Sequence, residues 1–304
     1  MVLILLASNR STGQRAVVAN VRGHHAAGAG PSRTAPGATA PAAPTTTATA
    51  TADPPLSDRS SPLGSAATDY LSTRSGDITA AVYDVSTGQT WTLKPGDAQA
   101  TASIVKVDVM AALLAQATST GQPLSASDQS LMTTMIEESD NDSATSLWNA
   151  VGGPSALSAF NGTIGMTQTT PSSCLTCPGF SWPGWGLTTT TAADQVDLLE
   201  HLIAPNAQIG NSERTYALGL MENIDPSERW GVTGGVPTGV TVALKNGWVP
   251  LSDSLWQINS IGWVDGDGRD YILAVLTDGN PSEDYGIDTI DALSGLVWTA
   301  MAPS

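Results

Sequence analysis

Apolar residues recur along most of this chain with two different spacings. Apolar and polar residues alternate over 77–85, and again over 90–94 after a Ser-Thr-Gly-Gln turn, which predicts a β-hairpin. Three more strands are expected towards the C-terminus, at 241–244, 255–264 and 270–277. The sheet is therefore expected to take strands from both ends of the chain.

Apolar positions three and four residues apart predict helices before, between and after these strands. The helix expected at 103–116 is apolar almost all round, as is typical of a central buried helix. An amphipathic helix ends the chain, and others are expected at 62–74, 126–137, 142–150, 154–162, 191–203 and 212–223. The pattern predicts an α/β chain of the α+β type. Its five-stranded antiparallel sheet is flanked by N- and C-terminal helices, with a small all-helical lobe across a cleft.

The first 62 residues follow neither spacing. Residues 1–25 are expected to be the remnant of an export signal or anchor, because their apolar run is far shorter than the roughly 20 residues that span a bilayer. Residues 26–62, rich in Ala, Pro and Thr, predict a disordered linker. The folded domain is expected over 63–304, and the protein is expected to be extracellular, either secreted or tethered to the cell envelope. A plain disordered terminus is the alternative for the tail.

Charge narrows the range of partners. The net charge is −16, and residues 65–304 carry 7 Lys and Arg against 26 Asp and Glu. Such an acidic surface argues against nucleic acid, because nothing in it could neutralise a run of phosphates. Membrane contact is expected only through the N-terminal anchor. The expected partner is a small-molecule or peptidoglycan-type substrate, bound by a monomer.

Cys174 and Cys177 are the two cysteines of the chain. A zinc site would need more ligands than this segment holds, and a redox role would need a strand–helix context in place of a Pro/Gly/Trp loop. A local disulfide is therefore expected. No metal or organic cofactor is expected elsewhere.

The chain has three lysines, and two of them lie in motifs that suit acyl transfer. Ser103-Ile104-Val105-Lys106 reads S-x-x-K, Ser139-Asp140-Asn141 reads S-D-N, and Lys245-Asn246-Gly247 reads K-x-G. Lys94-Pro95-Gly96 also reads K-x-G, but it precedes the serine motif and closes a hairpin. Histidine, the usual base, is nearly absent.

Each motif has a chemical reason. Ser103 and Lys106 share one face of a helix, and burial would lower the pKa of the lysine so that its neutral amine could activate the serine hydroxyl. Ser139 could relay a proton to the leaving nitrogen, and Asn141 could bind a substrate amide. Lys245 offers a cation for a substrate carboxylate near a strand end. Substrate binding is also expected from its neighbours Asn246, Gly247 and Trp248.

The three motifs in this order resemble the class A β-lactamase-like serine hydrolases of the β-lactamase/penicillin-binding transpeptidase superfamily. Further similar segments are Val151-Gly152-Gly153-Pro154, Phe160, Thr188 to Thr191, and Arg229-Trp230-Gly231. The resemblance covers about residues 65–302. It implies that Ser103 is the acylated nucleophile and Lys106 a base, with Ser139 as proton shuttle. It also implies an oxyanion hole made by the backbone N–H groups of Ser103 and Trp248.

The chain departs from that family where the acyl-enzyme is hydrolysed. Class A enzymes carry a glutamate on the loop beside the site, but Ser143 to Ala193 contains no Asp, Glu, Lys, Arg, His or Tyr. Asn246 also replaces the usual hydroxyl residue. Three functions stay open: a β-lactamase with another base (Glu137, Glu138 or Asp142), a D-alanyl-D-alanine carboxypeptidase or esterase-like peptidase, and a slowly acylated penicillin-binding sensor or scaffold.

Overall fold

The computed structural model describes residues 60–251 and 254–303, so the signal remnant predicted at 1–25 and nearly all of the predicted linker lie outside the described residues. One antiparallel sheet has the order β2–β1–β7–β6–β5. Its strands are β1 (Asp77–Asp84), β2 (Gln89–Leu93), β5 (Thr241–Pro250), β6 (Trp256–Gly266) and β7 (Arg269–Asn280). The C-terminal strand β7 lies at the centre and joins the N-terminal hairpin to β6. The predicted α+β fold with a sheet built from both ends of the chain is confirmed.

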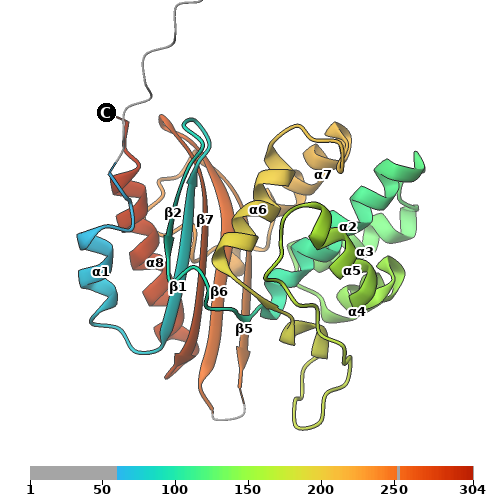
Figure 1. The fold of residues 1–304 in the computed structure, drawn as a ribbon, viewed down its shortest axis with the longest axis horizontal. Coiled ribbons are helices and arrows are strands. Elements are labelled where there is room, and N and C mark those ends of the chain that lie inside the picture. Colours follow the sequence, from blue (N-terminus) through green and yellow to red (C-terminus); the bar gives the residue numbers. More distant parts are fainter. Residues whose placement is uncertain (1–59, 252–253, 304) are drawn as a thin grey trace, which may run out of the picture. The chain divides into compact units, whose positions relative to one another are not determined.

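Helices cover both faces of this sheet (Figure 1). The terminal helices α1 (Ser65–Leu71) and α8 (Glu283–Ala300) lie together on one face. Arg74 fastens them, because its side chain donates to Thr289 Oγ1 and Tyr285 O on α8, each at 2.8 Å. Helix α6 (Ala192–Ile203) packs on the other face against β1 and β7. The strands β1, β5, β6 and β7 are accordingly buried along most of their length.

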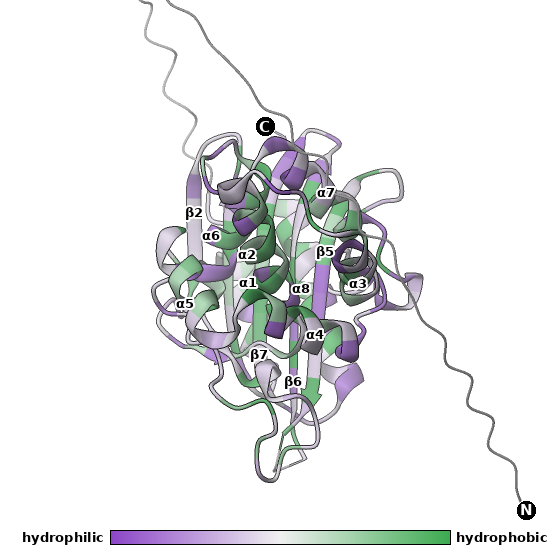
Figure 2. Ribbon diagram, turned by 90° about the vertical axis from the view of Figure 1, so that its right-hand side faces the viewer, coloured by the Kyte–Doolittle hydropathy of each residue, from purple (hydrophilic) through white to green (hydrophobic). Residues whose placement is uncertain are grey.

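The helical lobe lies beyond α6 and is built around α2 (Val105–Thr120). Eleven of the sixteen residues of α2 are buried, as predicted for a helix that is apolar almost all round. The segment Ala102–Thr120 has the length and hydropathy of a membrane span, but most of it is buried inside this domain. The apolar interior is visible where α2 crosses the core (Figure 2). Around it lie α3 (Ala126–Glu137), α4 (Asn141–Val151), α5 (Gly153–Thr163) and α7 (Asn211–Glu222).

Three local features differ from the sequence prediction. The strand expected at 241–244 continues to Pro250, because Lys245, Gly247 and their neighbours stay in antiparallel register with β6. The helix expected at 103–116 begins as a 3₁₀ turn, η1 (Ala102–Ile104), and runs on to Thr120. A second, two-stranded sheet pairs β3 (Gln99–Ala100) with β4 (Thr189–Thr190). This sheet is too short to show a hydrophobic period in the sequence. It connects the chain before η1 to the segment that follows the long loop between α5 and β4.

Candidate active site

A pocket of about 200 Å³ opens between the sheet and the helical lobe. Its walls come from five segments that are far apart in the sequence, which agrees with the expected cleft. The residues that line it are Ala102, Ser103, Glu138, Ser139, Asn141, Phe180, Trp182, Pro183, Trp185, Gly186, Glu228, Trp248 and Val249.

Ser103 lies half-buried in the 3₁₀ turn η1, directly before α2. Strand β5 passes against this turn at Gly247. A Cβ atom at Gly247 would lie 2.7 Å from both Ser103 N and Thr101 O, closer than real Cβ contacts. Only glycine lets the strand approach so closely, which explains the last residue of K-x-G. The contact brings the backbone of Trp248 beside that of Ser103.

Lys106 is one turn further on and is completely buried. Its Nζ lies within hydrogen-bond distance of Ser139 O at 2.5 Å, Ser139 Oγ at 3.0 Å and Asn141 Oδ1 at 2.9 Å. The Trp185 ring, with its centroid 5.1 Å from Nζ, covers the amine. Burial, followed by the positive charge of Lys245, lowers the pKa of Lys106 from 10.5 to about 6. The amine is thus mostly neutral at pH 7, as a general base must be.

Two non-glycine residues that line the pocket have left-handed backbone. Ser139 has φ 54° and Ala102 has φ 46°. Such conformations cost roughly 1–3 kcal/mol each and cluster at functional sites. At Ser139 the reason is visible, because this conformation directs both its carbonyl oxygen and its hydroxyl at Lys106.

Asp140, the middle residue of S-D-N, has a structural task. Its side chain accepts from the backbone N–H of Ser143 at 2.7 Å and so caps the N-terminus of α4. Hydrogen bonds from Ser143 lower the pKa of Asp140. The cap fixes the turn between α3 and α4. Ser139 and Asn141, which flank Asp140 in the chain, both contact the amine of Lys106.

Lys245 enters the site from the sheet. It is completely buried, and its Nζ forms an ion pair with Glu228 Oε2 at 3.0 Å. Burial lowers the pKa of Lys245, while the charge of Glu228 opposes that shift. Its neighbour Asn246 is equally buried and donates from Nδ2 to Glu228 O at 2.6 Å and Trp230 O at 3.1 Å. Asn246 therefore holds the backbone of the residue whose carboxylate pairs with Lys245.

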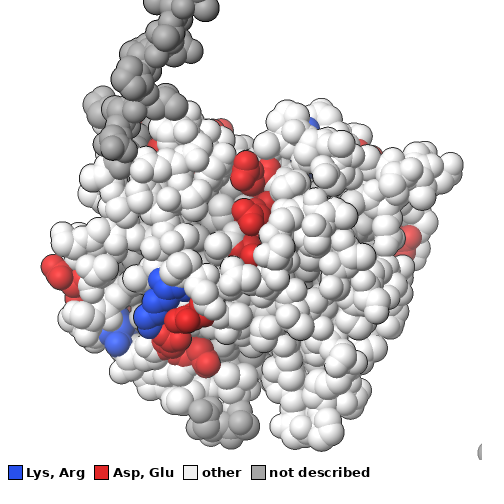
Figure 3. Space-filling view, viewed as in Figure 1, with Lys and Arg blue, Asp and Glu red and all other residues white. Residues whose placement is uncertain are grey.

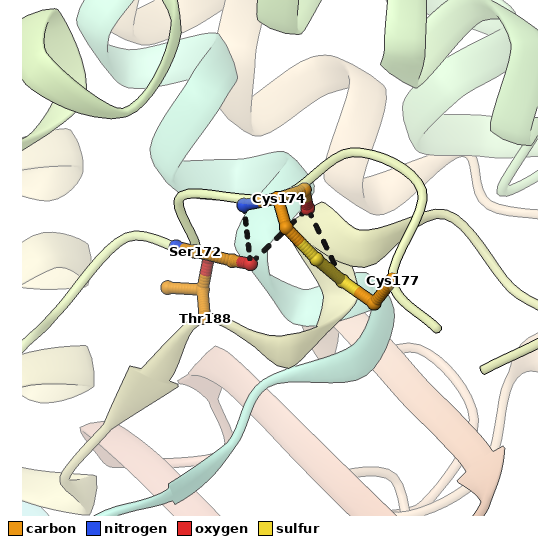
Figure 4. The surroundings of a disulfide bond; sticks show 4 residues. All are labelled: Ser172, Cys174, Cys177 and Thr188. Atoms are coloured by element: carbon orange, nitrogen blue, oxygen red, sulfur yellow. Dashed lines mark hydrogen bonds between the residues drawn. A yellow bond between two sulfur atoms is a disulfide. The ribbon is translucent and has the colours of Figure 1, made fainter. Parts of the chain in front are cut away.

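The long loop before β4 forms another wall of the pocket. Cys174 and Cys177 form a disulfide within it (Figure 4), with Cα atoms 5.7 Å apart. The bridge packs on the backbone of Gly184, where a Cβ atom would collide with Cys174 O and Cys177 Sγ. Next in the chain, Trp185 donates from Nε1 to Thr145 Oγ1 at 3.0 Å, so the loop is fastened to α4 beside Lys106.

The pocket has only two carboxylates among the described residues that line it, Glu138 and Glu228. Of the three alternative bases that the sequence suggests, Glu138 lies on the pocket, whereas Glu137 and Asp142 do not line it. The described residues contain no group of three His, Cys, Asp or Glu side chains placed to hold a metal ion.

The residues expected at the site meet in space, but in two layers. Ser103, Ser139, Asn141 and Trp248 line the pocket, and Lys106 and Lys245 lie buried behind that lining. Lys94 is elsewhere, half-exposed and paired with Asp77 at the end of β2. The sequence reasoning missed Glu228 and the contact of Trp185 with Lys106. A signal for Glu228 existed, because it directly precedes Arg229-Trp230-Gly231.

Comparison with known proteins places the chain in a family. A model of the β-lactamase enzyme family matches residues 119–301, a region that contains Ser139 and Lys245 and begins after Lys106. The putative lipoprotein LppW of Mycobacterium tuberculosis is 26% identical over 219 residues, which cover 69% of this chain and 65% of that protein. The same protein of Mycobacterium bovis matches equally. The chain thus spans just under two thirds of the length of these relatives.

Solved structures show the same fold at low identity. The TLA-1 extended-spectrum β-lactamase superposes with a TM-score of 0.70 at 17% identity, covering 79% of this chain and 98% of that one. A class A β-lactamase from Mycobacterium abscessus gives a TM-score of 0.65 at 22% identity, covering 77% and 96%. The family model matches well over half of the chain. The chain therefore belongs to the β-lactamase enzyme family and has the class A β-lactamase fold.

Proposed function

We propose that this chain is a serine hydrolase that forms an acyl-enzyme on Ser103 and hydrolyses a β-lactam or a related cell-wall amide or ester. The observation that supports this most is the state of Lys106. It is a fully buried amine with a pKa of about 6, one turn from a pocket-lining serine. Such a group takes a proton from a hydroxyl at neutral pH, which an exposed lysine cannot do.

The hydrogen bonds of Lys106 connect this base to Ser139. A neutral amine has two N–H groups and one lone pair, whereas Ser139 O and Asn141 Oδ1 can only accept. The Ser139 hydroxyl is thus the partner, of the three, that can donate to the lone pair. Lys106 and Ser139 are consequently placed to exchange a proton.

The acylation step follows from this arrangement. Ser103 Oγ adds to the substrate carbonyl carbon and forms a C–O bond while Lys106 Nζ takes the hydroxyl proton. The oxyanion is held by the N–H groups of Ser103 and Trp248. Collapse of the tetrahedral intermediate breaks the bond to the leaving nitrogen or oxygen, which receives the proton through Ser139. A water molecule then adds to the acyl carbon and gives up a proton, and the bond to Ser103 Oγ breaks as that oxygen regains a proton, which releases the acyl group as an acid.

The hydrolysis of the acyl-enzyme is the step that distinguishes the candidate functions. The long loop brings no carboxylate to the pocket, and Glu228 is paired with Lys245, so Glu138 is the carboxylate of the lining left to activate the water in a β-lactamase. This lack favours two other candidates as well: a D-alanyl-D-alanine carboxypeptidase or esterase-like peptidase, and a slowly deacylated penicillin-binding sensor or scaffold. All three share the acyl-enzyme on Ser103.

The location of the protein is also part of the proposal. A relative named as a putative lipoprotein supports attachment to the cell envelope, at 26% identity. A substrate of small-molecule or peptidoglycan type, met outside the cytoplasm by a monomer, fits this location.

One incubation tests the proposal. The purified protein and its Ser103→Ala variant are mixed with a penicillin, and intact mass and β-lactam ring opening are followed over time. We expect a mass increase equal to one penicillin in the wild type alone. Rapid loss of that adduct with turnover indicates a β-lactamase, and a lasting adduct indicates a peptidase or sensor. If neither a penicillin nor simple esters form an adduct, the proposal that this chain is an enzyme is wrong.

A further inference from the structure

Glu228 stands between Lys245 and the pocket. Its side chain is 13% exposed and lines the pocket, whereas Lys245 is completely buried and is absent from the lining. The ion pair between Lys245 Nζ and Glu228 Oε2 measures 3.0 Å. A substrate entering the pocket therefore meets the carboxylate first, and the cation behind it is already paired. Lys245, the lysine of K-x-G, is the residue that the sequence predicts to bind a substrate carboxylate.

Several contacts hold Glu228 in this place. Asn246 Nδ2 donates to its carbonyl oxygen at 2.6 Å, and Asn246 is itself completely buried. The N–H of Asp225, at the start of the same 3₁₀ turn η3 (Pro226–Glu228), donates to Glu137 O at 2.8 Å. On the other side, the N–H of Gly231 donates to Asp291 Oδ1 at 2.5 Å. With its backbone fixed at both ends of the turn, Glu228 is a built part of the wall.

Apart from Lys245, the amine of Lys106 also interacts with Glu228, but with a pKa of about 6 it is mostly neutral at pH 7. The lining contains Glu138 and Glu228 but no lysine or arginine. The nearest arginine in sequence, Arg229, donates instead to the backbone oxygens of Glu222 and Val242. The face drawn in Figure 3 shows a row of acidic side chains in its middle with no basic one among them, and a second acidic group beside basic side chains at the lower left. An anionic group in the pocket would lie against negative charge or would have to displace Glu228 from Lys245.

The rest of the wall is aromatic. Phe180, Trp182, Trp185 and Trp248 line the pocket, and the Trp248 ring meets Trp230 edge-on at 6.0 Å. Aromatic faces accept uncharged groups, and they attract cations, but they give a carboxylate no partner. Both the charge and the apolar character of the wall thus favour the same class of substrate.

We propose that Glu228 is a specificity-determining residue that makes this site select acyl donors without a carboxylate beside the scissile bond. The inference rests on the proposed acyl-enzyme on Ser103 and narrows its substrate to esters or amides that are uncharged or cationic on the side facing Lys245. Asn246 is the residue that positions Glu228, in the place where related enzymes have a hydroxyl group.

A penicillin and its methyl ester form a matched pair of probes for this inference. They share the acyl group and the leaving nitrogen and differ only in the negative charge. The second-order rate of adduct formation on Ser103 is measured for each by intact mass. In the wild type we expect the methyl ester to react at least tenfold faster than the free acid. In Glu228→Gln the ratio should fall at least tenfold, mainly because the free acid reacts faster.

Controls separate this effect from a general loss of charge or of folding. Glu222→Gln removes the same charge from an exposed residue outside the pocket and should leave the ratio within about threefold of the wild type. Glu228→Asp keeps the carboxylate and should retain the preference for the ester. If Glu228→Gln fails to fold, the ratio of the methyl ester rate to the free acid rate in the wild type and in Glu228→Asp still tests the inference.

The outcomes distinguish this inference from the proposal on which it rests. If the free acid labels wild-type Ser103 as fast as the methyl ester does, the inference on Glu228 is wrong and the acyl-enzyme stands. An equal ratio in the wild type and Glu228→Gln also overturns it. If neither probe labels Ser103, the proposed function fails and takes the inference with it.

Discussion

Two completely buried lysines serve this site from its two sides, and they differ in the charge of their partners. Lys106, from the helical lobe, is hydrogen-bonded to a carbonyl oxygen, a hydroxyl and an amide oxygen. Lys245, from the sheet, is paired with a carboxylate. A buried ammonium is costly unless a negative group compensates it. Lys106 therefore loses its proton near pH 6, whereas Glu228 opposes that loss at Lys245.

The comparison shows how one residue type supplies two functions within one site. In the proposed mechanism, lysine acts as a base where its hydrogen-bond partners are neutral, whereas the carboxylate of Glu228 opposes the loss of the proton at Lys245. The two are also coupled, because the charge of Lys245 contributes to the lowered pKa of Lys106. A charged Lys245 thus favours the neutral form of Lys106.

Replacing the neutral lysine should have the largest effect on chemistry. Lys106→Met keeps a long side chain in the buried space but removes the base, and we expect acylation to slow by about 10²–10⁴-fold, the usual contribution of a general base. Stability should be unchanged or higher, because the desolvated amine is gone. Adduct formation and thermal unfolding measure the two effects.

Lys94 provides the matched control for that change. It is half-exposed and pairs with Asp77 away from the pocket, so Lys94→Met should leave the acylation rate unchanged. Equal acylation by Lys106→Met and wild type would mean that another group activates Ser103.

Removing the partner of the charged lysine should act on stability. In Glu228→Gln the buried Lys245 has no counter-charge, and we expect a loss of about 3 kcal/mol in the free energy of unfolding at pH 7, as for other broken buried pairs. The unfolded lysine keeps its proton up to its ordinary pKa of 10.5, whereas the folded variant holds it less tightly. Stability should therefore rise with pH between 7 and 10. Urea unfolding at several pH values measures this.

A double variant sharpens the same comparison. Glu228→Gln combined with Lys245→Met removes the charge together with its partner and should recover most of the lost stability. If the single variant is no less stable than Glu222→Gln, the ion pair contributes nothing and the contrast between the two lysines loses its physical basis.

The sequence predicted the fold better than the electrostatics. Hydrophobic spacing located α3 at its observed bounds and placed most other elements within a few residues, because burial alone sets those patterns. Strand β5 was predicted too short, since Asn246 and Gly247 resemble the end of a strand. The reason for Gly247 is a contact with Ser103 N, 144 positions earlier in the chain, which no local pattern contains.

The candidate site could be predicted as a set of motifs but not as a set of partners. S-x-x-K and K-x-G name the lysines, yet neither motif shows which neighbour is charged. Glu228 reaches Lys245 because η3 and β5 are brought together by Asn246 and Trp230. The left-handed backbone of Ser139 is likewise a property of the turn between α3 and α4, held by the cap at Asp140. Charges and strain of this kind depend on tertiary contacts.

The most direct test of the account is the pH dependence of the second-order rate at which a penicillin methyl ester acylates Ser103. If Lys106 is the base, the rate rises about tenfold per pH unit below pH 6 and levels off above it, because the neutral amine is the active form and its pKa is about 6. The free enzyme sets this midpoint, so it can be read without knowing the natural substrate. A rate that keeps rising to pH 9 or beyond would show an ordinary amine pKa and contradict the account.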